Sequence, residues 1–284
     1  MTDLTRRAAV TGLAVAATTS PALAAGAPRR VVSMNACLDT VLVRVADRSQ
    51  IAALSHYARD PYGSTIADIA RTLPFTYETA EEVVSLNPDL VISSAHSSLA
   101  TRNALKRMGV RQERFSVPES VADSHKQIRD VAALVGHPER GEALIARIEA
   151  ALRAARPRLG QPRLTAVIFE PNGLAAGGGT LVSEMMDRCG FENVAGRYGL
   201  KKWGNIALEP LVADPPQVLL AGESAPGAPT WAERVVSHPA LKRVSGRMHR
   251  AVFPQRLLYC GGPVLIHTAA AMAKAREDAI RRFA

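Results

Sequence analysis

Residues 80–92 of the chain read AEEVVSLNPDLVI, and residues 208–220 read LEPLVADPPQVLL. Each stretch combines a glutamate in second position, a segment suited to a short helix, a proline turn and an apolar run suited to a buried strand. A unit of this kind can recur by chance in an α/β protein. The two copies flank a long helical stretch, however, and this arrangement favours two lobes of similar construction.

Short apolar runs alternate with helical patterns along most of the chain. Strands separated by helices indicate an α/β architecture with mostly parallel sheets. The runs that we predict to be strands occupy residues 30–33, 51–54, 89–92, 114–117, 165–169, 217–220 and 250–253.

The long helical stretch covers residues 121–156, where apolar residues recur at spacings of three and four. Gly136 and Pro138 interrupt it, and a proline is well tolerated as the first residue of a helix. We therefore predict two consecutive helices. The second, of roughly 19 residues, would extend about 28 Å, which is long enough to bridge two lobes.

Residues 1–24 have the features of an export signal. Arg6 and Arg7 precede a weakly apolar segment at 8–17, and Ala22-Leu23-Ala24 supplies the small residues of a cleavage site. A twin-arginine signal fits these features, and a general secretory signal with two chance arginines is the alternative. Neither a cysteine at the cleavage site nor a later run of about 20 apolar residues is present, so we expect no lipid anchor and no membrane-spanning helix.

The composition suits a folded, basic protein. With 284 residues, of which 47% are hydrophobic, the chain can form one large domain or two lobes. Its formal charge is +9, or +8 without residues 1–24, which contain two arginines and one aspartate. The basic residues are scattered, without the stripe and interleaved aromatic residues of a nucleic-acid-binding surface, so we expect no nucleic acid partner. The charge favours anionic ligands or surfaces.

Several short motifs are each weak evidence for a family, but their order and spacing in the chain are fairly specific. That order resembles the periplasmic binding proteins of vitamin B12 and iron-siderophore importers, class III of the substrate-binding proteins, over nearly all of the chain after residue 24. The motifs are RVVSMN at 30–35, IAALS at 51–55, the stretch at 81–92, AGGGTL at 176–181, CGFEN at 189–193, Trp203 and Glu209.

The resemblance implies an α/β fold of two Rossmann-like lobes, each with a mostly parallel sheet, joined by one long rigid helix. Its expected divisions are a signal peptide at 1–24, an N-terminal lobe at 28–122, a helical connection that includes the inter-lobe helix at 123–157, and a C-terminal lobe at 162–284.

The same resemblance implies a non-catalytic periplasmic protein that captures a metal chelate between its lobes and delivers it to the permease of an ABC importer. The candidate chelates are cobalamin or another corrinoid, an iron-siderophore and haem. We expect no resident cofactor, no metal ion held by the protein itself, no insertion into the membrane, and a monomer.

Two glutamates fall on the family's docking positions. In that family one glutamate from each lobe contacts arginines of the permease, and Glu81 and Glu209 match those positions. Two carboxylates on separate lobes would orient the protein on a basic partner. The alternative is that both simply occupy first turns of short helices, where the helix dipole favours a carboxylate.

The resemblance also implies aromatic side chains in the cleft. Tyr57, Phe75 and Trp203 fall where the vitamin B12 binder places such rings, and Tyr77 would replace Phe75 after a small alignment shift. Ordinary packing is the alternative, although Trp203 lies in a polar stretch at 201–205 that we predict to be a loop. Basic side chains could pair with carboxylates of an anionic chelate or remain solvated surface, and the candidates are Arg59, Lys201, Lys202 and Arg256.

Cys37 follows the first predicted strand and Cys260 precedes the last helix, so both should lie near a cleft at the carboxyl ends of strands. They could ligate a soft metal, bond to each other, or be small packed residues. The vitamin B12 binder lacks this pair, so the sequence departs from it here. With Cys189 there are three cysteines, too few for a disulfide scaffold and not spaced as a zinc motif.

Two other classes of protein remain as alternatives. A secreted α/β enzyme acting on a small anionic substrate would need a catalytic motif, and the chain has no Gly-x-Ser-x-Gly, Ser-x-x-Lys or His-Glu-x-x-His. The glycines at 177–179 are better explained by a turn before a helix capped by Thr180 than by a phosphate loop. A binding protein for free zinc or manganese would need three or four His and carboxylate ligands, and the histidines show no such set.

Overall fold

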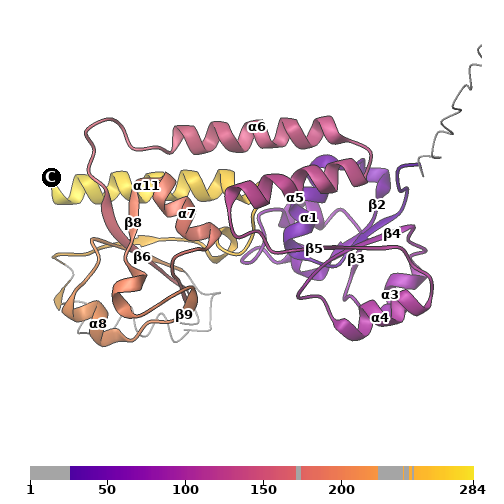
Figure 1. Ribbon diagram of the computed structural model, residues 1–284, viewed down its shortest axis with the longest axis horizontal. Helices are drawn as coiled ribbons and strands as arrows, with labels where there is room; N and C mark the ends of the chain where they lie inside the picture. Colours follow the sequence, from indigo (N-terminus) through magenta and orange to yellow (C-terminus); the bar gives the residue numbers. More distant parts are fainter. Residues whose placement is uncertain (1–25, 171–173, 223–238, 240–242, 245) are drawn as a thin grey trace, which may run out of the picture.

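The computed structural model describes residues 26–170, 174–222, 239, 243–244 and 246–284 (Figure 1). The export signal predicted at residues 1–24 lies outside the described residues. Among the residues that are described, no helix is both long enough and apolar enough to cross a membrane.

The first lobe is built on a five-stranded sheet in the order β3-β2-β1-β4-β5, with all neighbours parallel. Strands β1 and β4 are buried along their whole length, as expected for apolar strands covered by helices on both faces. The strands are β1 (Val31–Ser33), β2 (Ile51–Ser55), β3 (Phe75–Thr76), β4 (Leu90–Ser94) and β5 (Gln112–Phe115). The helices are α1 (Ala36–Val45), α2 (Ala67–Ala70), α3 (Ala80–Ser85) and α4 (Leu99–Arg107), with short 3-10 turns η1 (Arg48–Gln50) and η2 (His56–Arg59).

The second lobe has a mixed six-stranded sheet in the order β11-β10-β6-β7-β9, with β8 also paired to β6. Among the described strands of this sheet, β7 alone runs in the opposite direction, antiparallel to its neighbours β6 and β9. The strands are β6 (Leu164–Phe169), β7 (Leu174–Ala176), β8 (Phe191–Asn193), β9 (Trp203–Asn205), β10 (Val218–Ala221) and β11 (His249–Val252). The helical segments are α7 (Leu181–Arg188), η3 (Ala195–Tyr198), α8 (Leu208–Ala213), η4 (Gln255–Leu257) and α11 (Val264–Phe283).

The two lobes share a common parallel core. The neighbours β2-β1-β4-β5 of the first lobe correspond to β8-β6-β10-β11 of the second. The repeated sequence stretches form α3 followed by β4 and α8 followed by β10, so each is a short helix, a proline turn and a buried strand. The predicted echo and the predicted α/β fold of two lobes are confirmed.

Two helices connect the lobes, α5 (Val121–Leu134) and α6 (Pro138–Ala154). Pro138 begins α6, as predicted, because its missing N–H is not needed in the first helical turn. Helix α6 packs against α5 and α1 of the first lobe and against α11 of the second, and it lies along both in Figure 1. Its 17 residues extend about 25 Å, so one continuous rod joins the lobes.

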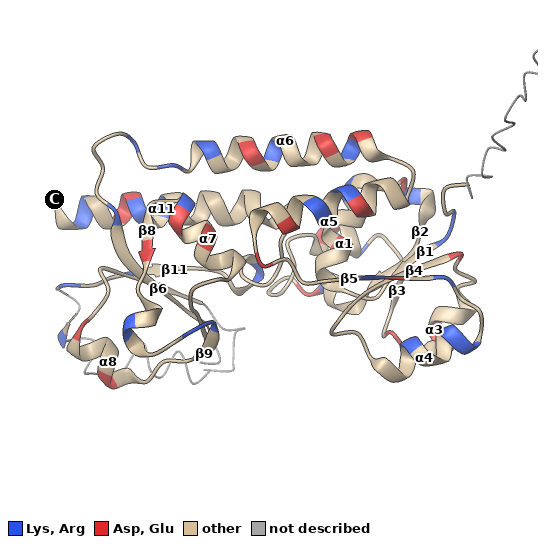
Figure 2. Cartoon of the chain, in the orientation of Figure 1, with Lys and Arg blue, Asp and Glu red and all other residues tan. Residues whose placement is uncertain are grey.

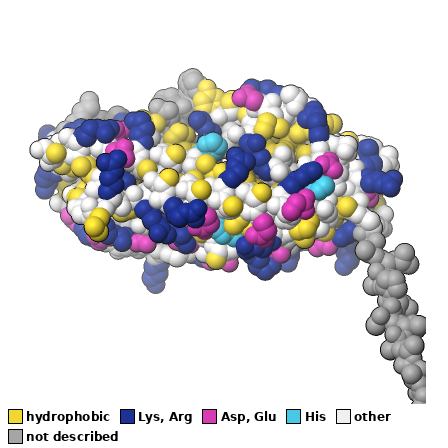
Figure 3. Space-filling view, turned by 90° about the horizontal axis from the view of Figure 1, so that it is seen from above, with side chains coloured by type: hydrophobic (Ala, Val, Ile, Leu, Met, Phe, Trp, Pro, Cys, Tyr) yellow, Lys and Arg dark blue, Asp and Glu magenta, His cyan; other side chains and the backbone are white. Residues whose placement is uncertain are grey.

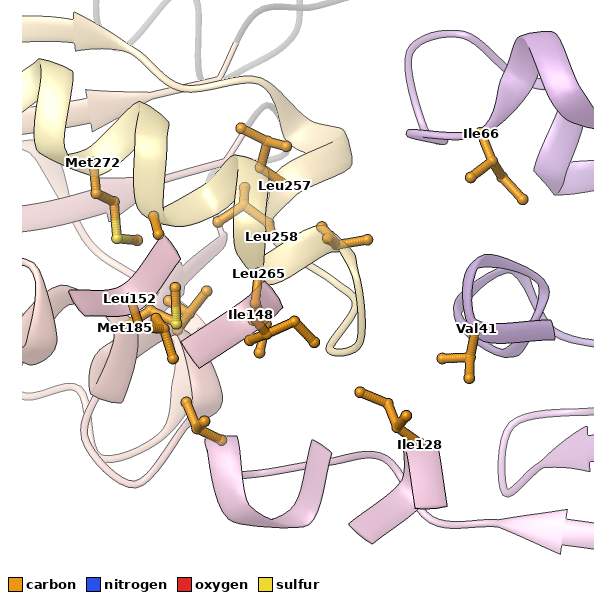
Figure 4. Close-up of a cluster of buried hydrophobic side chains, with 14 of the residues drawn as sticks. Val41, Ile66, Ile128, Ile148, Leu152, Met185, Leu257, Leu258, Leu265 and Met272 are labelled. Carbon is orange, nitrogen blue, oxygen red and sulfur yellow. The ribbon is translucent and has the colours of Figure 1, made fainter. Parts of the chain in front are cut away.

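A single apolar cluster continues from one lobe to the other beneath α6. Figure 4 shows Val41 of α1 and Ile128 of α5 on one side of this cluster and Met185 and Met272 on the other, with Ile148 of α6 between the two groups. Buried apolar side chains on α6 make the rod part of both cores, and this favours a fixed lobe arrangement.

The positions of some strands differ from the prediction. The strand expected at 114–117 is β5, which lies at 112–115, because this edge strand is half exposed and the apolar Val117 follows it. The stretch 201–205 was predicted to be a loop, and this is wrong for Trp203–Asn205. These residues form β9, whose polar composition suits an edge strand paired on one side with β7.

The face that carries α6 shows lysine and arginine mixed with aspartate and glutamate rather than gathered in one patch (Figure 3). Interleaved charges of this kind do not make the basic stripe that would favour nucleic acid.

Candidate functional site

A cavity of about 320 Å³ lies between the two lobes, within the usual range for small-molecule sites. Side chains of both lobes and of α5 form its wall, which is mainly apolar with a few polar groups. The lining residues are Asn35, Cys37, Leu38, Ser94, His96, Ser116, Val117, Pro118 and Glu119 of the first lobe, Gln127 of α5, and Thr180, Leu181, Val182, Lys202, Trp203, Leu258 and Tyr259 of the second lobe.

The first-lobe wall is built at the carboxyl ends of β1, β4 and β5, the edge where α/β sheets bind ligands. Asn35 caps α1 by accepting from the N–H groups of Cys37 and Leu38, at 3.0 and 3.1 Å. Its amide nitrogen donates to Ser94 Oγ at 3.1 Å, which ties the start of α1 to the end of β4. The cavity therefore has a fixed polar edge here.

The second-lobe wall combines the first turn of α7 with β9. Thr180 caps α7, as predicted, because its Oγ1 accepts from the N–H of Ser183 at 3.1 Å. Gly177 allows β9 to approach closely, since a Cβ at this position would lie 2.8 Å from the carbonyl oxygen of Lys201. Trp203, the first residue of β9, is 43% exposed, so its ring is available to a ligand.

Tyr259 links the cavity wall to a buried carboxyl group. Its hydroxyl donates to Glu170 Oε2 at 3.0 Å, and Gln255 Nε2 donates to the same hydroxyl at 3.3 Å. Burial raises the pKa of Glu170 to about 8, against the opposing effect of the tyrosine hydrogen bond. The pKa of Tyr259 is raised to about 12, mainly by burial and to a smaller extent by the nearby carboxyl group of Glu170. The pair presents a neutral phenol to the cavity at neutral pH.

The two cysteines that the sequence places near the cleft form a disulfide, with their Cα atoms 5.1 Å apart. Of the alternatives left open by the sequence, the structure contains the bond between Cys37 and Cys260. In this state neither sulfur is a thiolate that could ligate a metal. Cys189 is a buried free thiol, and burial raises its pKa to about 11.

Three predicted ligand-binding residues, Cys37, Lys202 and Trp203, line the cavity, and Cys260 adjoins it through the disulfide. Lys202 Nζ forms an ion pair with Glu119, which crosses from one lobe to the other. Sequence reasoning did not select Tyr259, Glu119 or His96 as site residues. The proximity of Tyr259 to Cys260 in the chain was the available signal.

The other predicted ligand-binding residues, Tyr57, Phe75, Tyr77 and Arg59, lie together at the β2 and β3 end of the first-lobe sheet, outside the cavity wall. Tyr57 and Tyr77 are 56% and 61% exposed. The ring of His56 lies 3.8 Å from that of Tyr57 and 5.0 Å from that of Tyr77, measured between centroids. These rings form an exposed aromatic cluster, and their contact with a ligand stays a prediction.

Arg59 holds its own loop in place. Its guanidinium lies 3.9 Å from the centroid of Phe75 and donates to the carbonyl oxygens of Ala70 and Leu73. Phe75 covers one face of the guanidinium, and two backbone carbonyl oxygens accept hydrogen bonds from its N–H groups. A ligand could therefore bind Arg59 only beside these partners or by displacing them.

Two further carboxyl groups lie at the same end of the first-lobe sheet. Burial raises the pKa of Asp39, in the first turn of α1, to about 8, although hydrogen bonds from Ser33 and Ser55 oppose this. Burial raises the pKa of Glu78 to about 7. The backbone of Glu78 has φ of +68°, a conformation that costs energy for a residue other than glycine.

A site for a bare metal ion needs several ligands in one place. Within the part of the chain that the structure describes, no three His, Cys, Asp or Glu side chains are grouped so that they could hold one. His96 and Tyr259 line the cavity, and imidazole and phenol groups are the kinds of donor that can ligate a metal carried inside a chelate. The Tyr259 hydroxyl, however, is already bonded to Glu170 and Gln255.

The sequence model of the family described as "Periplasmic binding protein" matches residues 31–253. Among solved structures, the periplasmic heme-binding protein RhuT from Roseiflexus sp. RS-1, in its apo form, is 25% identical, with a TM-score of 0.68, and the alignment covers 87% of this chain and 99% of that one. No curated protein sequence matches the chain at a significant level.

Two further solved structures share the fold. A periplasmic heme-binding protein from Pseudomonas aeruginosa is 24% identical, with a TM-score of 0.68 and coverage of 87% of this chain and 92% of that one. The periplasmic vitamin B12 binding protein BtuF of Vibrio cholerae is 14% identical, with a TM-score of 0.66 and coverage of 89% and 98%.

Proposed function

This chain belongs to the periplasmic binding protein family, and from that premise we propose that it is the substrate-binding component of an ABC importer that captures a metal chelate between its lobes. The observation that carries the proposal is the inter-lobe cavity, whose wall joins apolar side chains and the rings of Trp203 and Tyr259 to a few polar groups. Such a wall suits a ligand with a flat apolar face. Bond-making chemistry is not part of the proposal.

Among chelates, an iron porphyrin is our first candidate. Support comes from the 25% identity to the Roseiflexus heme-binding protein, which exceeds the 14% identity to the vitamin B12 binder. A porphyrin also matches the combination of Trp203 and Leu181, which offer apolar contact, with His96, whose imidazole is a common ligand of a chelated iron. A corrinoid and a ferric siderophore are the other candidates.

The anionic edge of such a ligand would meet positive potential in the cavity. Lys202 provides an ammonium group, which is paired with Glu119 across the lobes. The first turns of α1 and α7 also line the cavity, and the N-terminal end of a helix favours negative charge. A ligand carboxylate would compete with Glu119 for Lys202.

We further propose that Glu81 and Glu209 contact the permease. Each is an exposed residue in the first turn of a short helix, α3 and α8 respectively. These helices lie on the same side of the molecule, opposite α6 (Figure 2). Carboxylates on both lobes could thus meet one basic surface and orient the cavity toward the membrane. Export by the signal predicted at 1–24, through the twin-arginine or general secretory route, would place this monomer in the periplasm.

The proposal is tested by titrating the purified chain, without residues 1–24, with iron(III) protoporphyrin IX, metal-free protoporphyrin IX, cobalamin and a ferric siderophore. Absorbance spectra and native mass spectrometry would report the stoichiometry. We expect saturable binding of iron(III) protoporphyrin IX with a shifted visible spectrum. A folded protein that binds none of these compounds would refute the proposal.

A further inference from the structure

The segment at residues 259–262 leaves the second lobe after η4 and docks onto the first lobe before α11 begins. Cys260 is bonded to Cys37 at the start of α1, 223 residues away in the sequence. The N–H of Gly262 donates to Ser124 Oγ of α5 at 2.7 Å, in a buried position. Here the second lobe is therefore fastened to the first by both a covalent bond and a hydrogen bond.

Gly262 shows how tightly this segment fits. Its φ is +65°, and a Cβ at this position would lie 2.8 Å from the side chain of Val41 in α1. A larger residue would be strained and would push the segment away from α1. The sequence thus allows the close approach that the disulfide and the Ser124 hydrogen bond require.

The docked segment is a second connection between the lobes, separate from α6. Helix α6 by itself favours a fixed lobe arrangement, but any rotation of the lobes about it would change the width of the cavity. With a second, covalent connection at the cavity wall, the same rotation would have to stretch or break the disulfide. The two connections together hold the cavity at one width.

Tyr259, which precedes Cys260, is held in place at both its backbone and its hydroxyl. The peptide carbonyl of Tyr259 lies 3.5 Å from Cys37 Sγ, and its hydroxyl is held by Glu170 and Gln255. A ring that lines the cavity is therefore positioned from the first lobe at its backbone and from the second lobe at its hydroxyl.

We propose that the Cys37–Cys260 disulfide is a positioning element of the binding site, which limits rotation of the lobes about α6 and fixes Tyr259 in the wall. The effect on affinity rests on the proposed function, whereas the effect on lobe motion does not. Preorganisation of this kind raises affinity because less freedom is lost on binding.

The first measurement is a thiol count. The unreduced protein, unfolded in denaturant, should react with a thiol reagent at Cys189 alone, and at all three cysteines after reduction. Three reactive thiols without reduction would overturn the proposal.

The second measurement compares the wild type with the double variant Cys37→Ser/Cys260→Ser. Cys189→Ala is the matched control, since it removes a cysteine from the core and leaves the disulfide. Without ligand, we expect amide hydrogen exchange at 259–262 to be at least about tenfold faster in the double variant, a change of ~1.4 kcal/mol or more in opening free energy. We also expect a larger radius of gyration by small-angle X-ray scattering. The control should match the wild type.

The third measurement is titration with iron(III) protoporphyrin IX, for which we expect about tenfold weaker binding by the double variant. Equal exchange and equal binding in wild type and double variant would overturn the proposal. The wild type could fail to bind this compound while the exchange rates of wild type and double variant still differ. That result would support the positioning role of the disulfide and contradict the proposal that the ligand is an iron porphyrin.

Reduction of the wild type gives an independent test if the double variant does not fold. A phosphine reagent converts the disulfide to two thiols and is itself oxidised to the phosphine oxide with oxygen from water. Cys37 is partly exposed and so can be reached. The same acceleration of exchange at 259–262 is expected, and an unchanged rate after complete reduction would contradict the proposal.

Discussion

The hydroxyl of Tyr259 lies 3.0 Å from Oε2 of Glu170, a carboxyl group that is fully buried at the end of β6. The two residues are 89 positions apart, and their hydrogen bond joins the wall of the inter-lobe cavity to the central sheet of the second lobe. Oε1 of Glu170 is buried and has no hydrogen-bond partner among the described residues. A neutral acid is more favourable there than a carboxylate, because an unpaired buried charge is costly.

The first prediction concerns Glu170→Gln. Because the pKa of Glu170 is about 8, the group is mostly neutral at pH 7, and glutamine preserves both neutrality and a hydrogen-bond acceptor. Binding of iron(III) protoporphyrin IX at pH 7 should therefore be nearly unchanged. Above pH 8 the wild type should lose affinity as Glu170 ionises behind Tyr259, and the variant should not. Parallel loss of affinity in both proteins would show that another group titrates.

The second prediction concerns stability and pH. Asp39 and Glu170 keep their protons in the folded protein to about pH 8, whereas in the unfolded chain they ionise near the ordinary values of 3.8 and 4.5. Between these limits the folded state binds more protons, so the free energy of unfolding should fall as the pH rises from 5 to 8. The slope can reach about 1.4 kcal/mol per pH unit for each group.

Asp39→Asn provides the check on this slope, by urea unfolding at several pH values. The asparagine variant should show a smaller fall between pH 5 and 8 than the wild type. Surface carboxyl groups with lowered pKa values, such as Asp47, are ionised in both states above pH 5 and do not contribute. Burial lowers the pKa of His125 and of His249 from the ordinary value of 6.5, which acts in the opposite direction below that pH. Stability that is constant or rises between pH 7 and 8 would therefore contradict the buried neutral acids.

The third prediction concerns Trp203→Ala. Trp203 lines the cavity and is 43% exposed, so removal of its indole loses contact area with a flat ligand. We expect binding of iron(III) protoporphyrin IX to weaken about tenfold to hundredfold, which corresponds to ~1.4–3 kcal/mol. Phe283→Ala, at the far end of α11, is the matched aromatic control and should bind normally. Similar losses in both variants would point to a general loss of stability.

The fourth prediction concerns charge recognition by Lys202. Lys202→Gln should weaken binding of iron(III) protoporphyrin IX, whose carboxylates it would pair with, by about fivefold to tenfold. The dimethyl ester of the same porphyrin lacks those carboxylates and should bind equally to variant and wild type. If both ligands lose affinity alike, Lys202 contributes by packing or through its ion pair with Glu119.

The fifth prediction concerns docking. Glu81→Ala/Glu209→Ala should leave ligand binding within about twofold of the wild type, because both residues lie on short helices outside the cavity wall. Uptake of ligand by whole cells that depend on this protein should slow about tenfold or more. Glu277→Ala, at an exposed position of α11, is the control and should sustain normal uptake. Normal uptake by the double variant would remove the docking proposal.

Local patterns in the sequence determined the architecture. Apolar runs, the helical spacing at 121–156, Pro138 and the repeated stretches predicted two α/β lobes and their joining helix, and the structure confirms them. These features are readable because burial of strands and helix faces depends on residues close together in the chain. The shortest strands, such as β3 and β9, depend on a partner strand elsewhere and could not be predicted in this way.

The composition of the cavity was decided by tertiary structure. Sequence analysis selected Cys37, Lys202 and Trp203, which line it, but also Tyr57 and Phe75, which lie beside β2 and in β3, outside the cavity wall. It left the pairing of Cys37 with Cys260 open and did not indicate the contact of Tyr259 with Glu170. The disulfide joins residues 223 positions apart on different lobes, so it can form only once the joining helix has set the two lobes at one distance. The contact of Tyr259 with Glu170 joins residues 89 positions apart within the second lobe, so it exists only once the sheet of that lobe has formed.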